Sequence, residues 1–279
     1  MKKRIFKFII IFILIYYCGL TANAASLDTL RIPSPSMHKT LSAVIVLPDA
    51  YANGNQHFPV VYLLHGWSGS YKDWPAHIDL RPLSDRYGFI LVCPQGGYDS
   101  WYLDSPLDPG SRYETHIIKE VIPYIDLHFR TIKAKSGRAI TGLSMGGHGA
   151  LYLALRHPDL FFAASSMSGG VDLTFWPNKW GKAKYLGPYA QFPKRWKANS
   201  VVNMIPDFQK AHLAFMIDCG VDDFFITVNR RLHQKLIKAK VAHDYVERPG
   251  RHSWKYWTNA LEYHLLFFKK QRKLITGFH

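Results

Sequence analysis

The run GLSMGG at residues 142–147 constrains the fold of this chain more than any other segment. It follows residues 138–141, which fit a short strand leading into Gly142, and it precedes residues 150–156, which fit a helix. A turn of this kind holds Ser144 in a strained backbone conformation, with its hydroxyl above the end of a sheet. The flanking glycines have no Cβ atoms, which would collide there. The segment therefore predicts a strand, a tight turn carrying a serine hydroxyl, and a helix.

The rest of the chain alternates short apolar runs with amphipathic stretches. Further buried strands are predicted, from their apolar or β-branched composition and closing turn residues, at 41–47, 60–64, 89–93, 161–167, 212–218 and 243–248. Helices are predicted at 117–125, 225–238 and 254–270. Such alternation predicts an α/β fold with a mostly parallel central sheet and helices on both faces.

Residues 1–24 have the pattern of a cleavable signal peptide. Four basic residues precede an apolar run at 8–17, and Ala22-Asn23-Ala24 has the small-x-small pattern of a cleavage site. The apolar run is shorter than the ~20 residues that span a bilayer, so we expect a mature start at Ala25, no stable membrane span, and a secreted or periplasmic protein. Residues 25–279 show no repeat or linker and are expected to form a single domain. A retained anchor or a lipid on Cys18 is the alternative.

Composition limits the partners and cofactors of the chain. Its formal charge is +15, of which four positive charges lie in the first 24 residues. This charge could attract an acidic polysaccharide, but export and the absence of a nucleic-acid-reading motif argue against nucleic acid. The 14 His show no metal-ligand spacing, so we expect no metal and no other cofactor. We expect Cys93 and Cys219 to be buried thiols, with one bridge between them as the alternative.

A serine hydroxyl needs a base and an orienting carboxylate before it can attack an ester. In this class of fold their order along the chain is Ser, acid, His. We predict His252 as the base, because it lies in a loop between a predicted strand and the last helix. Asp223, in the turn after residues 212–218, is the predicted acid, with Asp222 and Asp172 as rivals. The alternative for each of these three carboxylates is a structural role in a surface turn or at a helix cap, which is the commoner role of Asp.

Two backbone N–H groups are predicted to stabilise an oxyanion beside the serine. Met145 begins the helix, where donors are unpaired and the dipole favours negative charge. Trp67 follows the predicted strand 60–64, in a loop where Gly66 lets the backbone approach a substrate. For the loop that carries Trp67, the alternative is an ordinary turn with His65 packed beneath it. For the turn at Ser144, the alternative is a serine that only caps a helix.

Five stretches resemble the esterase D family of α/β hydrolases. That family includes feruloyl and acetyl xylan esterases, tributyrin esterases, S-formylglutathione hydrolases and mycolyltransferases. The stretches are YLLHGWSGSYKDW from Tyr62, GLSMGGHGALYLALRHPDLF from Gly142, SSMSGG from Ser165, DCGVDDFF from Asp218 and PGRHSWKYW from Pro249. The resemblance implies an α/β-hydrolase fold with an eight-stranded type of sheet, and these site residues: Ser144 as nucleophile, Asp223 as acid, His252 as base, and Trp67 and Met145 as oxyanion donors.

Residues 171–201 are long for a connection between two strands and are rich in aromatic side chains. Trp176 and Trp180 within this segment, with Trp101 and Tyr102 before it, are candidate substrate-binding residues that could stack on sugar or hydroxycinnamoyl rings. Simple packing beneath a long loop is the alternative. We predict a secreted serine carboxylesterase that removes acetyl or feruloyl groups from polysaccharide or its oligosaccharides. An acyltransferase of the same fold and a non-catalytic glycan-binding module are the alternatives, and the sequence does not indicate an oligomeric state.

Overall fold

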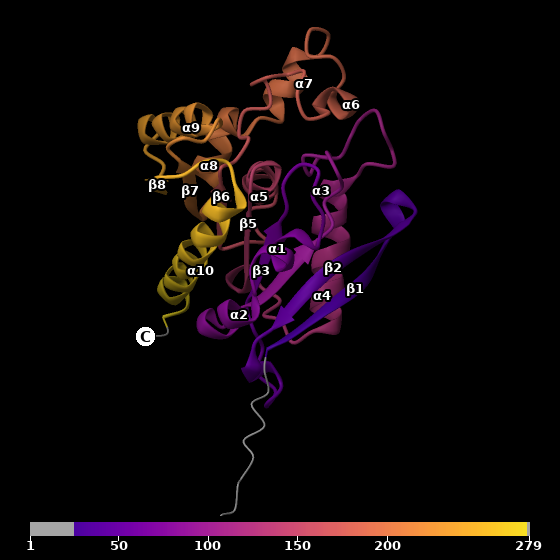
Figure 1. Cartoon of the computed structure of the whole chain (residues 1–279), viewed down its shortest axis with the longest axis vertical. Helices are drawn as coiled ribbons and strands as arrows, with labels where there is room; N and C mark the ends of the chain where they lie inside the picture. Colours follow the sequence, from indigo (N-terminus) through magenta and orange to yellow (C-terminus); the bar gives the residue numbers. More distant parts are fainter. Residues whose placement is uncertain (1–24, 278–279) are drawn as a thin grey trace, which may run out of the picture.

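The computed structural model describes residues 25–277 and contains one eight-stranded sheet with the order β1-β2-β4-β3-β5-β6-β7-β8 (Figure 1). The strands are β1 (Ser26–Ser34), β2 (Lys39–Leu47), β3 (Val60–Leu64), β4 (Ile90–Pro94), β5 (Arg138–Gly142), β6 (Ala163–Met167), β7 (Ala214–Gly220) and β8 (Asp244–Arg248). Strands β3 to β8 pair in parallel, whereas β1 and β2 pair antiparallel and β2 joins β4 antiparallel. The predicted α/β fold with a mostly parallel sheet is confirmed.

Strand β1 is the one strand of this sheet that the sequence did not predict. Most of its residues are exposed, because the strand lies at the edge of the sheet and pairs only with β2. Pro33 within it is tolerated at an edge, where a backbone N–H is not required by a second neighbour. The segment therefore lacks the continuous apolar run that marks the other strands.

Helices cover both faces of the sheet (Figure 1). They are α1 (Asp73–His77), α2 (Arg81–Tyr87), α3 (Tyr113–Thr115), α4 (Ile122–His128), α5 (Met145–Arg156), α6 (Lys182–Leu186), α7 (Pro193–Ala198), α8 (Ile205–Ala211), α9 (Ile226–Lys238) and α10 (Trp254–Thr276). A π-helical segment, η3 (His116–Val121), joins α3 to α4 without a break. Pro123 has no N–H to donate to the carbonyl of Lys119, and a wider turn accommodates that loss.

Alternate residues of the central strand β3 enter two separate cores. Val60, Tyr62 and Leu64 pack with residues of η3, α4, α5 and α9, whereas Val61 and Leu63 pack with residues of α2 and α10. All five residues are buried, which is why this parallel strand is a continuous apolar run in the sequence. The parallel arrangement brings the carboxyl ends of neighbouring strands to one edge, where α/β folds carry their sites.

The long connection between β6 and β7 carries α6, α7 and α8, and Figure 1 shows α6 and α7 at the top of the molecule. Cys93 and Cys219 are both buried and unpaired, as expected. Burial raises the pKa of both thiols, which makes them inert. Among residues 25–277, no helix combines the length and apolar character that crossing a bilayer requires. The predicted signal peptide, residues 1–24, lies outside the described residues.

Candidate active site

Ser144 occupies the turn between β5 and α5, with φ +54° and ψ −114°. Few non-glycine residues adopt a positive φ, and such strain is retained where the surrounding structure enforces it. A Cβ atom on Gly146 would lie 2.5 Å from the carbonyl oxygen of Leu64, and one on Gly142 would lie 2.5 Å from that of Gly146. Only glycine fits at both positions, so the turn is packed tightly enough to hold the serine in its strained conformation.

His252 connects Ser144 to Asp223 through two hydrogen bonds. Its Nε2 lies 2.9 Å from Ser144 Oγ, and its Nδ1 lies 2.8 Å from Asp223 Oδ2. The other carboxylate oxygen of Asp223 accepts the backbone N–H of Phe225 at 2.8 Å. With Nδ1–H donated to the buried carboxylate, Nε2 is left bare and accepts the serine hydroxyl. This is the geometry in which an imidazole removes a proton from a serine.

The two rival carboxylates lie elsewhere. Asp222 is exposed, and its backbone N–H donates to the carbonyl of Gly250. Asp172 accepts hydrogen bonds from the amide and hydroxyl of Thr174 and pairs with Arg231 at 3.0 Å. Neither carboxylate contacts His252. The structure therefore brings Asp223, and neither rival, to the imidazole.

Three aromatic rings surround His252. The ring centroids of Phe224, Phe225 and Trp257 lie 4.1, 5.5 and 4.8 Å from that of the imidazole. Trp257 is fixed in turn, because its Nε1–H donates to Ser168 Oγ at 3.1 Å. The imidazole is thus held in one orientation by packing as well as by hydrogen bonds.

The backbone N–H groups of Trp67 and Met145 have no hydrogen-bond acceptor among residues 25–277. The loop that carries Trp67 lies against the serine: a Cβ atom on Gly66 would be 3.6 Å from that of Ser144 and 2.6 Å from a methyl of Leu143. Unpaired amides beside a nucleophile are what stabilisation of an oxyanion requires. Both predicted donors are thus unpaired amides, one next to Ser144 in the chain and one in the loop that lies against it; their role as oxyanion donors stays a prediction.

His65 holds this loop from beneath. Its Nε2 accepts the backbone N–H of Gly96 at 2.8 Å, so its Nδ1 carries the proton and donates to the carbonyl of Gly66, also at 2.8 Å. Burial lowers the pKa of His65 and keeps the ring neutral. His65 therefore packs beneath the turn, as the alternative interpretation expected, and the backbone N–H of Trp67 in the same loop has no acceptor among residues 25–277.

A pocket of about 210 Å³ opens beside Ser144 and His252. Aromatic side chains form much of its lining: Trp67, Trp180, Phe224, Trp254 and Trp257. The ring of Trp176, which is 43% exposed, lies 5.6 Å from that of Trp180 and 5.9 Å from that of Phe224. Of the predicted pair, Trp180 therefore lines the pocket, and Trp176 packs beside two of its lining residues. Within the described part of the chain, no three His, Cys, Asp or Glu side chains gather to hold a metal ion.

Phe224, Trp254 and Asp73 also lie at the pocket but were not predicted. Phe224 follows the predicted acid directly, and Trp254 begins the predicted last helix, so their positions in the chain were a usable signal. Asp73 Oδ1 accepts hydrogen bonds from the amide and hydroxyl of Ser70, and no pattern in the sequence marks it.

Trp101 and Tyr102 do not line the pocket, and the expectation that they stack on a substrate is wrong. Both have positive φ and are buried, with exposed fractions of 2% and 0%. Trp101 Nε1–H donates to the carbonyl of Trp180 at 3.2 Å, and the Tyr102 hydroxyl donates to that of His65 at 3.1 Å. Their turn directs the rings inward, where they support the pocket wall and the Trp67 loop.

Lys182, in α6, is buried inside the long connection between β6 and β7. Its ammonium donates to the carbonyls of Leu173 and Phe175, both at 2.8 Å. It also lies 5.3 Å from the ring of Trp180 and 5.4 Å from that of Trp101. Desolvation lowers the pKa of Lys182 to about 7. This lysine ties the start of the connection to the tryptophan that forms the pocket wall.

Comparison with known proteins adds independent information. A family model described as "Putative esterase" matches residues 34–268. An esterase of Mycobacterium tuberculosis (strain ATCC 25618 / H37Rv) is 30% identical over 236 residues, which cover 75% of this chain and 51% of the relative, so the chain spans about half of that relative's length. An acetyl esterase of Caldicellulosiruptor saccharolyticus is 26% identical and covers 75% of this chain and 84% of the relative. The solved structure of a ferulic acid esterase is 29% identical, with a TM-score of 0.77, and the match covers 89% of this chain and 98% of that one.

Proposed function

The chain belongs to the esterase family whose model matches residues 34–268, and from this we propose that it is a secreted serine carboxylesterase acting through a covalent acyl-enzyme. The observation that carries the proposal is the hydrogen-bonded chain from Ser144 Oγ through His252 to Asp223. The unpaired amides of Trp67 and Met145 beside it supply the second requirement of acyl transfer.

The proposed reaction begins when Ser144 Oγ attacks the ester carbonyl carbon and its proton passes to His252 Nε2. The carbonyl oxygen becomes an oxyanion that the N–H groups of Trp67 and Met145 stabilise. Collapse of this intermediate breaks the bond to the alcohol oxygen, which takes the proton from His252. Water then attacks the acyl-serine by the same route, releasing the carboxylic acid and restoring the hydroxyl.

The substrate we propose is an acetyl or feruloyl ester on a polysaccharide or its oligosaccharides. Trp67, Trp176 and Phe224 expose between 38% and 43% of their surface around the pocket. Large apolar rings exposed together mark a place where a ligand packs. The acetyl esterase and ferulic acid esterase to which the chain is similar support an ester of this kind.

The export that we propose rests on the composition of residues 1–24. Expression in a bacterium with its secretion pathway intact, followed by N-terminal sequencing of the recovered protein, tests it. We expect a mature protein that starts at Ala25 outside the cytoplasm. Recovery of uncleaved protein from the cytoplasm would contradict export without affecting the proposed chemistry.

Covalent labelling with a fluorophosphonate tests the proposed nucleophile. The parent protein should be labelled and Ser144→Ala should not, because an unactivated serine does not react with this probe. Ser36→Ala, which removes a hydroxyl that does not line the pocket, serves as the matched control and should be labelled like the parent. The same three proteins are then assayed on nitrophenyl acetate, methyl ferulate and acetylated xylan. Equal hydrolysis by Ser144→Ala and the parent would overturn the proposal.

The nature of the attacking group is tested by product analysis in the presence of an added alcohol. Free carboxylic acid as the main product supports hydrolysis. A new ester as the main product, formed even though water is in excess, would instead make the protein an acyltransferase of the same fold.

A further inference from the structure

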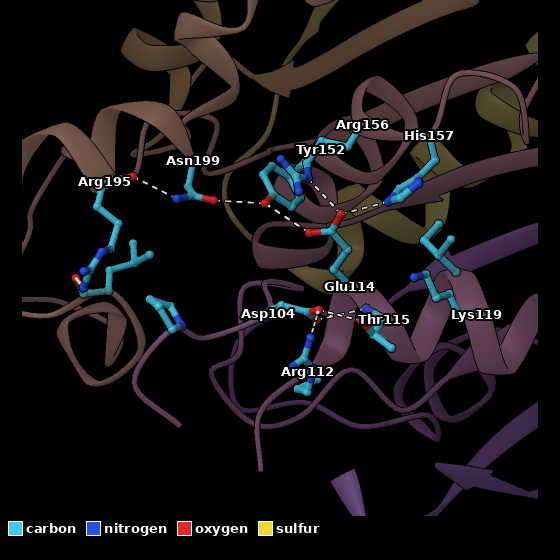
Figure 2. A pocket seen from close by; sticks show the side chains of 13 residues that line it. Asp104, Arg112, Glu114, Thr115, Lys119, Tyr152, Arg156, His157, Arg195 and Asn199 are labelled. Atoms are coloured by element: carbon cyan, nitrogen blue, oxygen red, sulfur yellow. Dashed lines mark hydrogen bonds and ion pairs between the residues drawn. The ribbon is translucent and has the colours of Figure 1, made fainter. Parts of the chain in front are cut away.

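A second cavity, of about 540 Å³, lies apart from the serine pocket (Figure 2). Its walls come from α3 and η3, from the C-terminal half of α5, and from α7 in the connection between β6 and β7. None of its lining residues lines the pocket beside Ser144. Its volume falls in the range of cavities that hold small organic ligands.

The two carboxylates of this cavity already have donors from the protein. Glu114, which is buried, accepts hydrogen bonds from Arg156 Nε and His157 Nε2, both at 2.8 Å. Asp104 accepts the amide and hydroxyl of Thr115 at 2.9 and 2.5 Å. Burial by itself raises the pKa of Glu114, but hydrogen bonds from its basic neighbours outweigh burial and hold the pKa below its usual value. The acceptor capacity of the cavity is therefore largely used.

The basic groups of the cavity, by contrast, keep unused donors. Lys119 Nζ makes no hydrogen bond or ion pair with any residue of the described chain. Arg156 uses only Nε for its ion pair, which leaves its terminal nitrogens available. Arg195 donates Nη1 to the carbonyl of Leu186 at 2.9 Å and keeps its other terminal nitrogen. With Arg112, four permanent cations face two carboxylates, so the cavity has excess positive charge and excess donors.

These cations are spread around the cavity rather than gathered at one point. Figure 2 shows Arg195 on the opposite side from Lys119 and His157, with Arg112 on a third side. Neutral polar groups lie between them: the Tyr152 hydroxyl is 2.9 Å from Asn199 Oδ1. Because the cations lie on different sides of the cavity, they suit a ligand that carries several polar groups better than a single small anion. A longer ligand that carries carboxylates along with hydroxyl groups would meet several of the cations.

We propose that this cavity binds a carboxylate-bearing saccharide, such as a segment of an acidic polysaccharide with hexuronate units. Guanidinium groups bind carboxylates in a bidentate manner, and amide and hydroxyl side chains suit the neutral hydroxyls of the sugar.

Calorimetric titration of the mature protein with trigalacturonate tests the proposal, with galactotriose as the neutral counterpart. We expect the acidic trisaccharide to bind at least about tenfold more tightly, and its affinity to fall as salt is raised from 0.05 to 0.2 M, which are roughly the conditions under which surface charges become screened. Equal binding of the two sugars, or binding of neither, would overturn the proposal. So would inorganic phosphate or sulfate that binds as tightly as trigalacturonate, since the cavity would then hold any anion.

The double variant Lys119→Gln/Arg195→Gln assigns the binding to this cavity. Both side chains lack a carboxylate partner, so their neutral replacements leave no acid unpaired, and thermal unfolding checks the fold. We expect trigalacturonate affinity to fall about tenfold or more, because each lost charged hydrogen bond weakens binding substantially. Lys270→Gln, on the exposed side of α10, is the matched control and should bind like the parent. Unchanged affinity in the double variant would place any binding elsewhere and end the proposal.

This inference goes beyond the proposed esterase function and does not require it. Fluorophosphonate labelling reports on Ser144, whereas titration reports on the cavity. Loss of one result with retention of the other therefore shows which proposal has failed.

Discussion

The ring of Phe224 lies between the His252 imidazole and the indole of Trp180, with centroid distances of 4.1 and 5.8 Å. Its plane is inclined by only 19° to that of the indole. One side chain thus connects the proposed base to the long connection between β6 and β7, and 42% of its surface is exposed at the pocket. Phe224 is therefore a neighbour both of Trp180, in the pocket wall that would contact an acyl group, and of His252, which would move the proton.

Substitution of Phe224 by Ala tests this wall. We expect kcat/KM for methyl ferulate to fall roughly tenfold, since aromatic pairing contributes about 0.5–1.5 kcal/mol beyond the area buried. The loss for nitrophenyl acetate should be smaller, because an acetyl group has no ring to stack. Steady-state kinetics on both esters make the comparison, and Tyr263→Ala, an exposed aromatic on α10, is the control. Equal losses on the two esters would show that Phe224 acts only through His252.

The acid assigned by geometry is tested with two neighbouring substitutions. Asp223→Asn should lower kcat on nitrophenyl acetate by roughly 10⁴, because the amide no longer orients the imidazole in the reactive tautomer. Asp222→Asn should leave kcat nearly unchanged, since that side chain is exposed and does not reach His252. The reverse outcome would transfer the role to Asp222.

Gly146→Ala should destabilise the protein through a steric clash. The new methyl would lie 2.5 Å from the carbonyl oxygen of Leu64 and 2.6 Å from that of His65, and backbone atoms of a central strand cannot move aside easily. We expect a loss of roughly 1–3 kcal/mol in the free energy of unfolding, measured by urea denaturation. Gly110→Ala is the control, because its nearest neighbour is the flexible side chain of Asp108 at 3.2 Å. Similar stabilities for the two variants would contradict the tight packing of the turn.

Lys182 should make stability depend on pH. Desolvation lowers its pKa from 10.5 to about 7 in the folded protein, so between these values the unfolded chain binds the extra proton. The contribution of this lysine to stability therefore rises as pH increases through that window. Lys182→Met keeps a similar volume and removes the titration. The melting temperature of the parent minus that of this variant should therefore increase as pH is raised from 7 to 10.

Lys238→Met, at an exposed position near the end of α9, is the matched control. Its difference from the parent should stay constant over the same pH range. If the difference for Lys182→Met is constant as well, the buried lysine does not titrate in this window and the expected linkage is absent.

Local sequence was sufficient where a residue's neighbours in the chain also decide its environment. The predicted strand at residues 60–64 has the same bounds as β3, because a strand buried on both faces must be apolar throughout. The run GLSMGG predicted the turn at Ser144 for a related reason. Its glycines avoid steric clashes with atoms of the strand, turn and helix in which they lie and with atoms of the adjoining strand. Strand β1 and the short helices were missed, since short or exposed elements carry no such pattern; these helices are α1, α2, α3, α6, α7 and α8.

Only the tertiary structure could decide which side chains meet. Ser144 and His252 are 108 residues apart, and His252 is 29 residues from Asp223. The sequence named Asp223 as the acid but left Asp222 and Asp172 as rivals, and these are excluded by how the turn after β7 faces the loop after β8. The same applies to Trp101 and Tyr102, whose rings a positive φ turns inward, and to the second cavity, which three distant segments enclose. The chain's own pattern encodes backbone conformation and burial over a few residues. The direction in which a side chain points across a turn, and what it then contacts, is set by segments packed from elsewhere.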